Sequence, residues 1–155
     1  FSNFSCPVEV MQKEAQTAVE QLSPVDLAYL DPPYNQHPYG SNYFMLNLLA
    51  SGQEPAAEEL SQVSGIPKNW NRSHYNKARH IKTVLERLIA TIPASCLLIS
   101  YNSEGFIKPE EMDVLLSSHG KTTRMECPYN TFRGSRNLAN RSLHVTEYLY
   151  VVDKR

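Results

Sequence analysis

The chain has 155 residues, of which 41% are hydrophobic and 20% are charged, a balance typical of one globular domain with a substantial core. Its net charge of −1 excludes the overall positive charge of many nucleic-acid-binding proteins, so any such contact must come from local basic clusters. The three cysteines form no Cys-x-x-Cys pair, which indicates neither a zinc site nor a disulfide framework and favours reduced thiols in the cytoplasm. No apolar run reaches the length of a membrane span, so we expect no membrane partner.

The first third of the chain predicts two strands and two helices. Pro7–Gln12 alternates apolar and polar residues, as strands do, and Glu14–Leu22 places its apolar residues on one helical face. A Ser-Pro pair ends that helix before Asp26–Leu30, an apolar segment that predicts a strand, buried if helices flank it. Asp31–Gly40 is rich in proline, asparagine and glycine and predicts a loop, whereas Asn42–Ala50 predicts a short apolar helix.

The middle of the chain begins with a polar insertion. Residues 51–73 are broken by glycines and prolines and predict a loop or lid. Tyr75–Ile92 then predicts the longest helix, because an apolar residue recurs every three or four positions. Cys96–Tyr101 predicts a strand that ends in a turn over Asn102–Gly105, and Pro109–His119 predicts a helix with proline first and acids in its first turn.

The chain ends with two predicted strands, Thr122–Cys127 and Leu143–Val152, which are separated by a polar and basic loop over Pro128–Arg141. Because no helix lies between them, we expect an antiparallel pair at the edge of the sheet. The earlier strands alternate with helices, which predicts a mostly parallel sheet with crossover helices on both faces. The fold class is therefore α/β.

Polar residues gather where the predicted strands end. Asp31–Tyr34 and Asn102–Gly105 each follow a strand of the predicted parallel sheet, and Glu14 follows the first predicted strand. Ligands of such sheets bind beyond the carboxyl ends of the strands. We therefore expect these three clusters to meet at one rim and to form a site there.

The run Asp31-Pro32-Pro33-Tyr34 combines a carboxylate, a rigid backbone and an aromatic ring. An exocyclic amine such as that of adenine is a poor nucleophile, because its lone pair is conjugated into the ring. Asp31 and the carbonyl of Pro32 are two acceptors that could take both amine hydrogens and localise that lone pair for attack on a sulfonium methyl group. Tyr34 could stack on a base pulled out of the duplex. The other interpretation is that the Pro-Pro pair is no more than a stiff exit from a strand.

The same run, placed after an apolar strand, resembles motif IV of the N6-adenine DNA methyltransferases. Residues 35–43, Asn-Gln-His-Pro-Tyr-Gly-Ser-Asn-Tyr, are similar to the Dam-like class, especially to members from restriction–modification systems. Residues 100–105, 129–133 and 147–150 resemble the later strand-end motif, the C-terminal loop and the last strand of that class. The likeness extends from about residue 8 to the end of the chain.

The resemblance implies a Rossmann-like methyltransferase sheet, S-adenosylmethionine as cofactor and the N6 amine of adenine in double-stranded DNA as substrate. It implies catalytic roles for Asp31, Pro32, Pro33 and Tyr34, and cofactor contacts for Glu14 and Asp31. We expect no metal site, because the five histidines lack the spacing of metal ligands. It also implies a cognate restriction endonuclease as a possible partner. Contacts to the substrate are expected from Tyr34, Tyr39, Asn42, Tyr101, Asn102, Arg133 and Arg136.

Several of these residues have a second interpretation. Glu14 is also a favourable acid in the first turn of a helix, whose dipole it complements. Tyr101 and Asn102 are also typical of a turn at a strand end. Tyr39 and Tyr43 could flank the flipped base or the DNA backbone, and Tyr43 is also a candidate for packing in the core. Two basic clusters are candidates for phosphate contacts or for ordinary solvated surface, namely Arg72, His74, Lys77, Arg79, His80 and Lys82, and Arg133, Arg136 and Arg141.

One expected element of the family is absent from the sequence. Such enzymes carry a Phe-x-Gly-x-Gly loop that helps to bind S-adenosylmethionine, and this chain has no Gly-x-Gly anywhere. In the Dam-like order that loop and a target-recognition domain precede the segment seen here. We therefore interpret residues 1–155 as the C-terminal part of a catalytic domain that is incomplete at its N-terminus, with the other half of the same enzyme as its partner.

Two other functions stay open at this point. The first is methylation of another planar amine, in an RNA base or a protein glutamine, although such enzymes more often begin the tetrapeptide with Asn than with Asp31. The second is a non-catalytic remnant that binds DNA or a second polypeptide, which the missing glycine loop favours. Retention of Asp31, Pro32 and Tyr34 favours an active enzyme.

Overall fold

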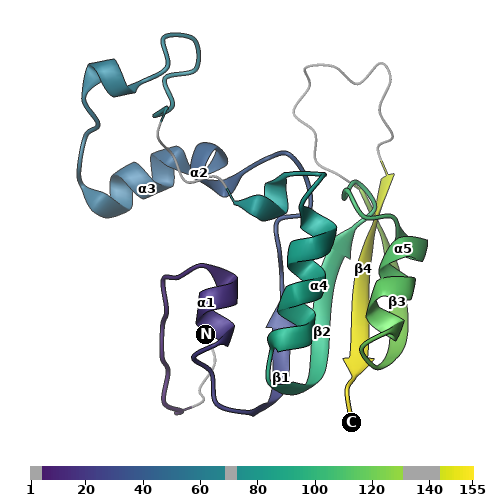
Figure 1. Ribbon diagram of the computed structural model, residues 1–155. Coiled ribbons are helices and arrows are strands. Elements are labelled where there is room, and N and C mark those ends of the chain that lie inside the picture. The colour runs from purple at the N-terminus through teal and green to yellow at the C-terminus, as the bar shows by residue number, and fades with distance from the viewer. Residues whose placement is uncertain (1–4, 69–72, 131–143) are drawn as a thin grey trace.

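The computed structural model describes residues 5–68, 73–130 and 144–155, and its centre is a four-stranded sheet (Figure 1). The strands lie in the order β1-β2-β4-β3, so the first strand forms one edge and β3 the other. Their bounds are Val25–Leu30 for β1, Ala94–Asn102 for β2, Lys121–Asn130 for β3 and His144–Asp153 for β4.

The sheet is mixed, which corrects the prediction of a mostly parallel one. β1 and β2 run parallel, in the register that aligns Leu27 with Cys96 and Tyr29 with Leu98. β4 is antiparallel to both β2 and β3. The predicted antiparallel pair at the end of the chain is confirmed, but β4 inserts between β2 and β3, so antiparallel pairing predominates.

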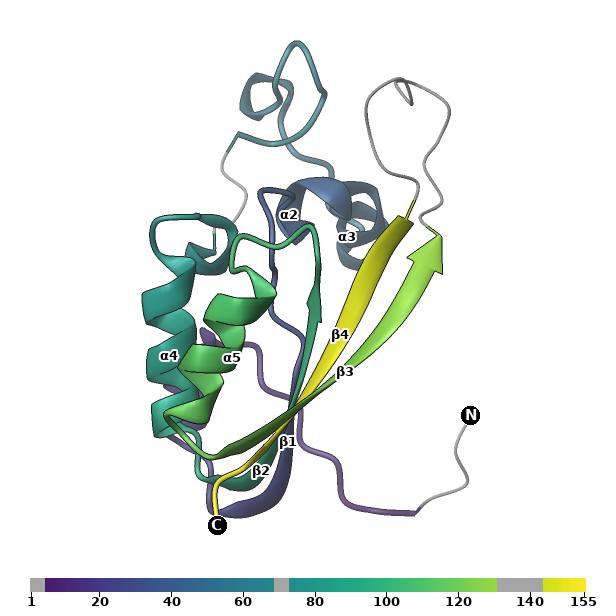
Figure 2. The same ribbon diagram turned by 90° about the vertical axis from the view of Figure 1, so that its right-hand side faces the viewer.

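Three helices pack on one face of the sheet, and they bury the core between themselves and the strands (Figure 2). They are α1 (Ala15–Val19), α4 (Ile81–Thr91) and α5 (Pro109–Ser117). The predicted apolar stripe of α4 is buried, because its residues recur at helical spacing and face Leu97 and Ile99 of β2. The side chains that are fully buried belong mostly to this layer: Tyr101, Tyr150, Ile81, Leu85, Ile89, Leu97, Ile99, Met112, Leu116 and Val152.

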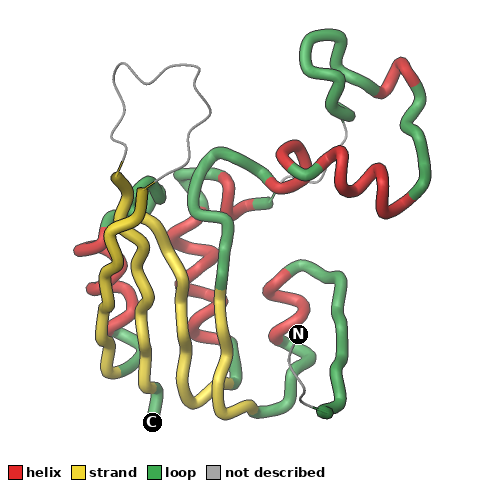
Figure 3. The backbone as a smooth tube through the Cα atoms, turned by 180° about the vertical axis from the view of Figure 1, so that it is seen from behind, coloured by secondary structure: helices red, strands yellow, loops and turns green. Residues whose placement is uncertain are grey.

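The prediction of helices on both faces is wrong for the part of the chain that the structure describes. Viewed from behind, the strands lie nearest the viewer and the helices lie behind them (Figure 3). Leu27 and Tyr29 of β1 project to this side and are 53% and 60% exposed. Helices cover both faces of a sheet only when successive connections between strands pass on opposite sides of it. In the segments described here, α4 and α5 lie on the same side.

The predicted strand over Pro7–Gln12 is also wrong, because this segment is irregular in the structure. Val8 and Val10 are 79% and 88% exposed, so the alternation of apolar residues buries nothing here. A strand needs a neighbour that satisfies its backbone N–H and C=O groups. Among the described residues, β1 has such a neighbour on its β2 side only.

An arm projects from the rim of the sheet between β1 and α4 (Figure 1). It consists of α2 (Tyr39–Asn42), α3 (Phe44–Ser51) and the described part of residues 51–73, which contains a 3-10 turn over Ala57–Glu59. The predicted helix over Asn42–Ala50 is thus confirmed, with a shifted start. None of the helices in the described ranges is long and apolar enough to cross a membrane.

Candidate active site

Asp31–Tyr34 leaves β1 at the rim of the sheet, as the sequence predicts, and a neighbouring loop holds its far end. The backbone N–H of Phe106, in the loop after β2, donates to the Tyr34 carbonyl at 2.9 Å. The Tyr34 ring meets the ring of Tyr101 edge-on, with 5.8 Å between centroids. Pro32 is buried and Asp31 is exposed, so the carboxylate is presented to solvent on a rigid backbone.

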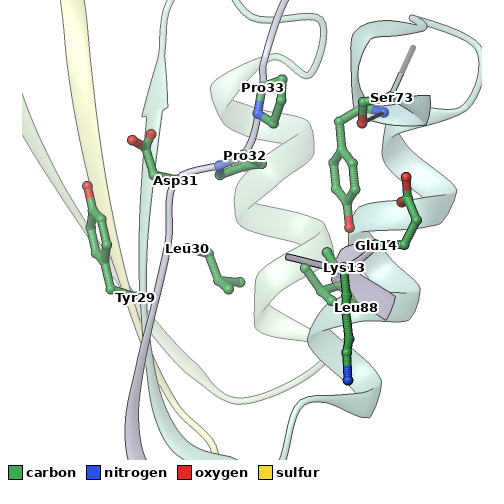
Figure 4. A pocket seen from close by; sticks show the side chains of 11 residues that line it. Lys13, Glu14, Tyr29, Leu30, Asp31, Pro32, Pro33, Ser73 and Leu88 are labelled. Atoms are coloured by element: carbon green, nitrogen blue, oxygen red, sulfur yellow. Dashed lines mark hydrogen bonds between the residues drawn. The ribbon is translucent and has the colours of Figure 1, made fainter. Parts of the chain in front are cut away.

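A pocket of about 330 Å³ lies on one side of this run, and we call it the Asp31 pocket (Figure 4). Leu30 and Leu88 give it an apolar floor, while Asp31, Glu14 and Ser73 supply polar groups. Figure 4 shows Asp31 and Tyr29 projecting to one side of β1 and Leu30 to the other. Its full lining is Lys13, Glu14, Ala15, Tyr29, Leu30, Asp31, Pro32, Pro33, Ser73, Tyr75 and Leu88.

A second hollow of about 210 Å³, which we call the tyrosine cleft, lies at the start of the arm. Tyr39 and Tyr43 pair within it, with ring centroids 5.5 Å apart. Pro33 lines both this cleft and the Asp31 pocket, so the Asp-Pro-Pro-Tyr run separates the two cavities. The cleft is lined by Pro33, Tyr34, Asn35, His37, Tyr39, Asn42 and Tyr43.

The aromatic rings of the cleft are kept neutral. Burial, followed by the nearby Glu147 and Tyr39, raises the pKa of Tyr34 above its ordinary value. Burial and the charge of Asp31 raise the pKa of Tyr39 in the same way. A phenol of ordinary pKa is already protonated at neutral pH, so both rings are uncharged there, and their faces suit stacking against a planar base.

The structure places Tyr75 in the Asp31 pocket, a residue that the sequence assigned only to the start of a helix. Burial, with a contribution from the charge of Glu14, raises the pKa of Tyr75 to about 12. Tyr75 belongs to a 3-10 turn over His74–Asn76. Ser73 precedes this turn, and its hydroxyl accepts a hydrogen bond from the Tyr75 N–H at 3.2 Å. Asn76 ties this turn to the Asn35 carbonyl at 2.8 Å. No local sequence signal reveals these contacts, because they depend on how the chain segments meet in space.

Tyr101 and Asn102 lie behind Tyr34 and do not line either cavity. Tyr101 is 1% exposed, and its hydroxyl accepts from the Ile107 N–H at 3.3 Å. Asn102 is 4% exposed, donates to Glu147 Oε1 at 2.6 Å and accepts from the Glu104 N–H at 2.7 Å. Their observed contacts therefore support the loop, and the contact that the sequence predicts with substrate stays a prediction.

The structure describes the first basic cluster except for Arg72 and none of the second. His74, Lys77, Arg79, His80 and Lys82 are exposed before and at the start of α4. Lys82 is paired with Glu111 at 3.6 Å. Arg72 of this cluster and the second cluster, with Arg133 and Arg136, lie outside the described residues, so their predicted phosphate contacts stay predictions.

Comparison with known proteins identifies the family. A family model described as "D12 class N6 adenine-specific DNA methyltransferase" matches residues 3–112. Type II methyltransferase M.CviAII of Paramecium bursaria Chlorella virus 1 is 29% identical over 137 residues, and M.NlaIII of Neisseria lactamica is 27% identical over 148. Type II methyltransferase M.FokI of Planomicrobium okeanokoites is 30% identical over 146 residues.

These alignments cover nearly all of this chain but much less of each relative. They include 88% of this chain and 40% of M.CviAII, 94% and 43% for M.NlaIII, and 92% and 22% for M.FokI. The chain thus spans less than half the length of the curated relatives that it matches. No solved structure matches it. Because the family model covers most of the sequence, the chain belongs to the D12 class of N6 adenine-specific DNA methyltransferases.

Proposed function

We propose that this chain is the C-terminal catalytic part of an S-adenosylmethionine-dependent enzyme that methylates the N6 amine of adenine in double-stranded DNA. The observation that carries the proposal is the position of the Asp-Pro-Pro-Tyr run between two cavities, with Pro33 lining both. A methyl donor on one side and a planar base on the other would meet at this run. Family membership supports the same reaction.

In the proposed reaction the chain orients the amine, and the amine nitrogen then takes the methyl group by direct displacement. The Asp31 carboxylate and the Pro32 carbonyl accept the two amine hydrogens, which localises the lone pair on nitrogen. Tyr34 stacks on the base and holds it in line with the methyl group, so that positioning supplies much of the rate. The surplus proton leaves the methylated nitrogen by way of Asp31, which is open to solvent.

The residues of the Asp31 pocket fit S-adenosylmethionine by their chemistry. Asp31 and Glu14 are carboxylates suited to the ammonium and hydroxyl groups of that molecule, and Ser73 adds a hydroxyl. Tyr75, Leu30 and Leu88 supply an apolar and aromatic floor for a purine. When bound, the cofactor supplies an electrophilic methyl group on a sulfonium. Glu14, Tyr75 and Ser73 would hold and orient it.

We further propose that the chain works together with an upstream half that contains the glycine loop and the target-recognition domain. The greater length of the relatives supports this division. A completed Rossmann-like methyltransferase sheet, contacts from Arg133 and Arg136 to the DNA backbone, and action beside a restriction endonuclease belong to the same proposal. The type II names of the relatives support the last point.

The test is methyl transfer from labelled S-adenosylmethionine to duplex DNA by this chain joined to its upstream half. Asp31→Ala should reduce the rate by about 100- to 1,000-fold, the typical effect of removing a group that stabilises developing charge. Asp26→Ala is the matched control, because Asp26 is an exposed acid at the other end of β1. Absence of label in the adenine of the DNA, or a normal rate in the Asp31 variant, would refute the proposal.

Base stacking has its own readout. Tyr34→Ala should weaken extrusion of the target base by about 5- to 150-fold, since stacking on an aromatic ring contributes about 1–3 kcal/mol. The fluorescence of 2-aminopurine at the target position reports extrusion directly. An unchanged fluorescence together with an unchanged rate would remove Tyr34 from the base site.

A further inference from the structure

A side-chain hydrogen bond joins the two sides of the candidate site. The amide Nδ2 of Asn76, in the 3-10 turn before α4, donates to the backbone carbonyl of Asn35 at 2.8 Å, between residues that are 41 positions apart. Both residues are half-buried, so the bond is partly shielded from water. No other hydrogen bond connects His74–Asn76 to residues 31–43 in the part of the chain that the structure describes.

The turn that carries Asn76 forms part of the wall of the Asp31 pocket. Tyr75 directly precedes Asn76 and lines this pocket together with Ser73. The ring of Tyr75 is 8% exposed and belongs to the core that α4 forms with the sheet, so the turn is fixed to the helical layer. Figure 4 shows Ser73 on one side of the pocket and Asp31 on the other. The turn is therefore the side of the pocket that faces the Asp-Pro-Pro-Tyr run.

Asn35 lies at the far end of that run. It directly follows Tyr34, and both residues line the tyrosine cleft. Before them, Pro32 and Pro33 have φ angles that their rings lock, so this backbone has little freedom to bend. A shift of the Asn35 carbonyl is therefore passed on to the ring of Tyr34 and to the carbonyl of Pro32, because no flexible segment lies between them.

Two other anchors hold the run, and they tie it to different parts of the molecule. At its start, Leu30 is in register with Ile99 of β2, which fixes the run to the sheet. Near its end, the Tyr34 carbonyl accepts from the Phe106 N–H at 2.9 Å, which fixes it to the loop after β2. Neither anchor involves the turn that lines the Asp31 pocket. The bond from Asn76 therefore sets where the run lies relative to that turn.

We infer that Asn76 is a positioning residue for methyl transfer, which sets the spacing between a methyl donor in the Asp31 pocket and a base held by the Asp-Pro-Pro-Tyr run. Asn76 is not among the residues that line either cavity, so it acts through the Asn35 carbonyl. This inference rests on the proposed function, which supplies the donor and the base. Displacement depends steeply on geometry, since a misplacement of about 1 Å can lower a rate about 100-fold. A bond that served stability alone would leave the rate of transfer unchanged in the folded enzyme.

The test measures single-turnover methyl transfer by this chain joined to its upstream half, with enzyme and labelled S-adenosylmethionine in excess over duplex DNA. Asn76→Leu keeps a side chain of similar size but has no donor, and it should slow transfer at least about tenfold. The dissociation constants for S-adenosylmethionine, by calorimetry, and for DNA, by fluorescence anisotropy, should each change less than about threefold, because the bond acts on geometry and not on binding. Asn76→Ala repeats the test without the bulk of leucine.

Two further variants separate the donor from general packing. Asn76→Gln keeps an amide that can donate, so it should transfer methyl groups faster than Asn76→Leu. Ser118→Ala is the matched control, because it removes another partly buried hydrogen bond from a side chain to a carbonyl, the 2.7 Å bond from Ser118 to Leu115 at the C-terminal end of α5. Its rate should stay within about twofold of the unaltered enzyme, since distant sites act independently. Urea unfolding shows that each variant is folded.

The outcomes separate this inference from the proposed function. Slow transfer at unchanged affinity in Asn76→Leu and Asn76→Ala, with recovery in Asn76→Gln, would uphold the positioning role. A normal rate in either folded variant that lacks the amide would overturn it, and the proposed reaction would stand. A loss confined to affinity, or an equal loss in Asn76→Gln and Asn76→Leu, would overturn it as well. If the unaltered enzyme methylates no adenine, the proposed function itself is refuted, and Asn76 then has no transfer to position.

Discussion

Reversing the polarity of the Asn102–Glu147 hydrogen bond tests whether this pair holds the loop behind Tyr34. Asn102 donates to Glu147 at 2.6 Å and accepts from the Glu104 N–H at 2.7 Å, and it is 4% exposed. The loop then continues to Phe106, whose N–H donates to the Tyr34 carbonyl. Asn102→Asp keeps the shape of the side chain but replaces the donor with a carboxylate that faces Glu147.

The expected loss of stability follows from these contacts. A hydrogen bond to a charged group contributes about 1.5–3 kcal/mol, and two carboxylates at about 4 Å repel by up to about 4 kcal/mol at a dielectric constant near 20. Because Glu147 is half-buried and water screens part of the repulsion, we expect Asn102→Asp to lower the free energy of unfolding by about 3 kcal/mol at pH 8.

The pH dependence has a definite sign. Two carboxylates that share one site raise the pKa of one of them in the folded state. A pKa raised by folding gives stability that is present at low pH and lost as the pH rises through it. The loss caused by Asn102→Asp should therefore be smaller at pH 4 than at pH 8.

The assay is urea denaturation followed by circular dichroism at both pH values. Adding Glu147→Gln should restore most of the stability, because the introduced amide would donate to one oxygen of the introduced carboxylate, while its other oxygen still accepts from the Glu104 N–H. Glu147→Gln alone serves as the control, since it keeps the shape at that position and completes the double-mutant cycle. A loss below about 0.5 kcal/mol in the single variant, or no recovery in the double variant, would refute the reasoning.

Three further changes test contacts at Gly105, in the Asp31 pocket and at the end of α4. Gly105→Ala should destabilise the chain by about 1–3 kcal/mol in urea, because a Cβ there would lie 2.3 Å from the ring of Tyr101; normal stability would show that the loop can move aside. The free energy of unfolding should fall by about 2–3 kcal/mol between pH 10 and 12, because the pKa of Tyr75 is about 12 in the fold and the unfolded chain therefore ionises first. Tyr75→Phe should remove this fall, whereas the exposed control Tyr29→Phe should not. Parallel pH curves for the two variants would contradict the prediction. Lys154→Met should lower stability by about 1–2 kcal/mol in thermal unfolding, because Lys154 donates to the Ile89 and Ile92 carbonyls at the end of α4. The control Lys82→Met, which breaks the exposed Lys82–Glu111 pair, should cost less than about 0.5 kcal/mol. Equal losses in the two variants would show that Lys154 has no special role.

Local sequence patterns predicted the elements that depend only on residues close to one another in the sequence. The apolar stripe of α4 and the strand over Asp26–Leu30 were both predicted correctly, because each depends on a pattern within one segment. The 3-10 turn at His74–Asn76 shortened the predicted helix over Tyr75–Ile92, because Lys77 is extended and interrupts the helical backbone.

Pairing between distant segments could not be predicted in the same way. The alternation in Pro7–Gln12 is that of a strand, yet the segment finds no neighbour among the described residues. Likewise Tyr75 reaches the Asp31 pocket only because α1, α4 and the end of β1 meet there. The strand order and the packing of the helices on one face result from contacts between distant segments. Such contacts leave no periodic signal in the sequence.

The sequence by itself determined the chemistry of the rim, since a carboxylate, two prolines and a tyrosine at the end of a strand are covalently adjacent and stay together in any fold. Only the tertiary structure decided what surrounds that run: two cavities that share Pro33, a partly buried Asn102–Glu147 pair, and a sheet face that the described helices leave uncovered. The physical reason is that backbone geometry and side-chain spacing act over a few residues, whereas burial depends on which distant surfaces pack together.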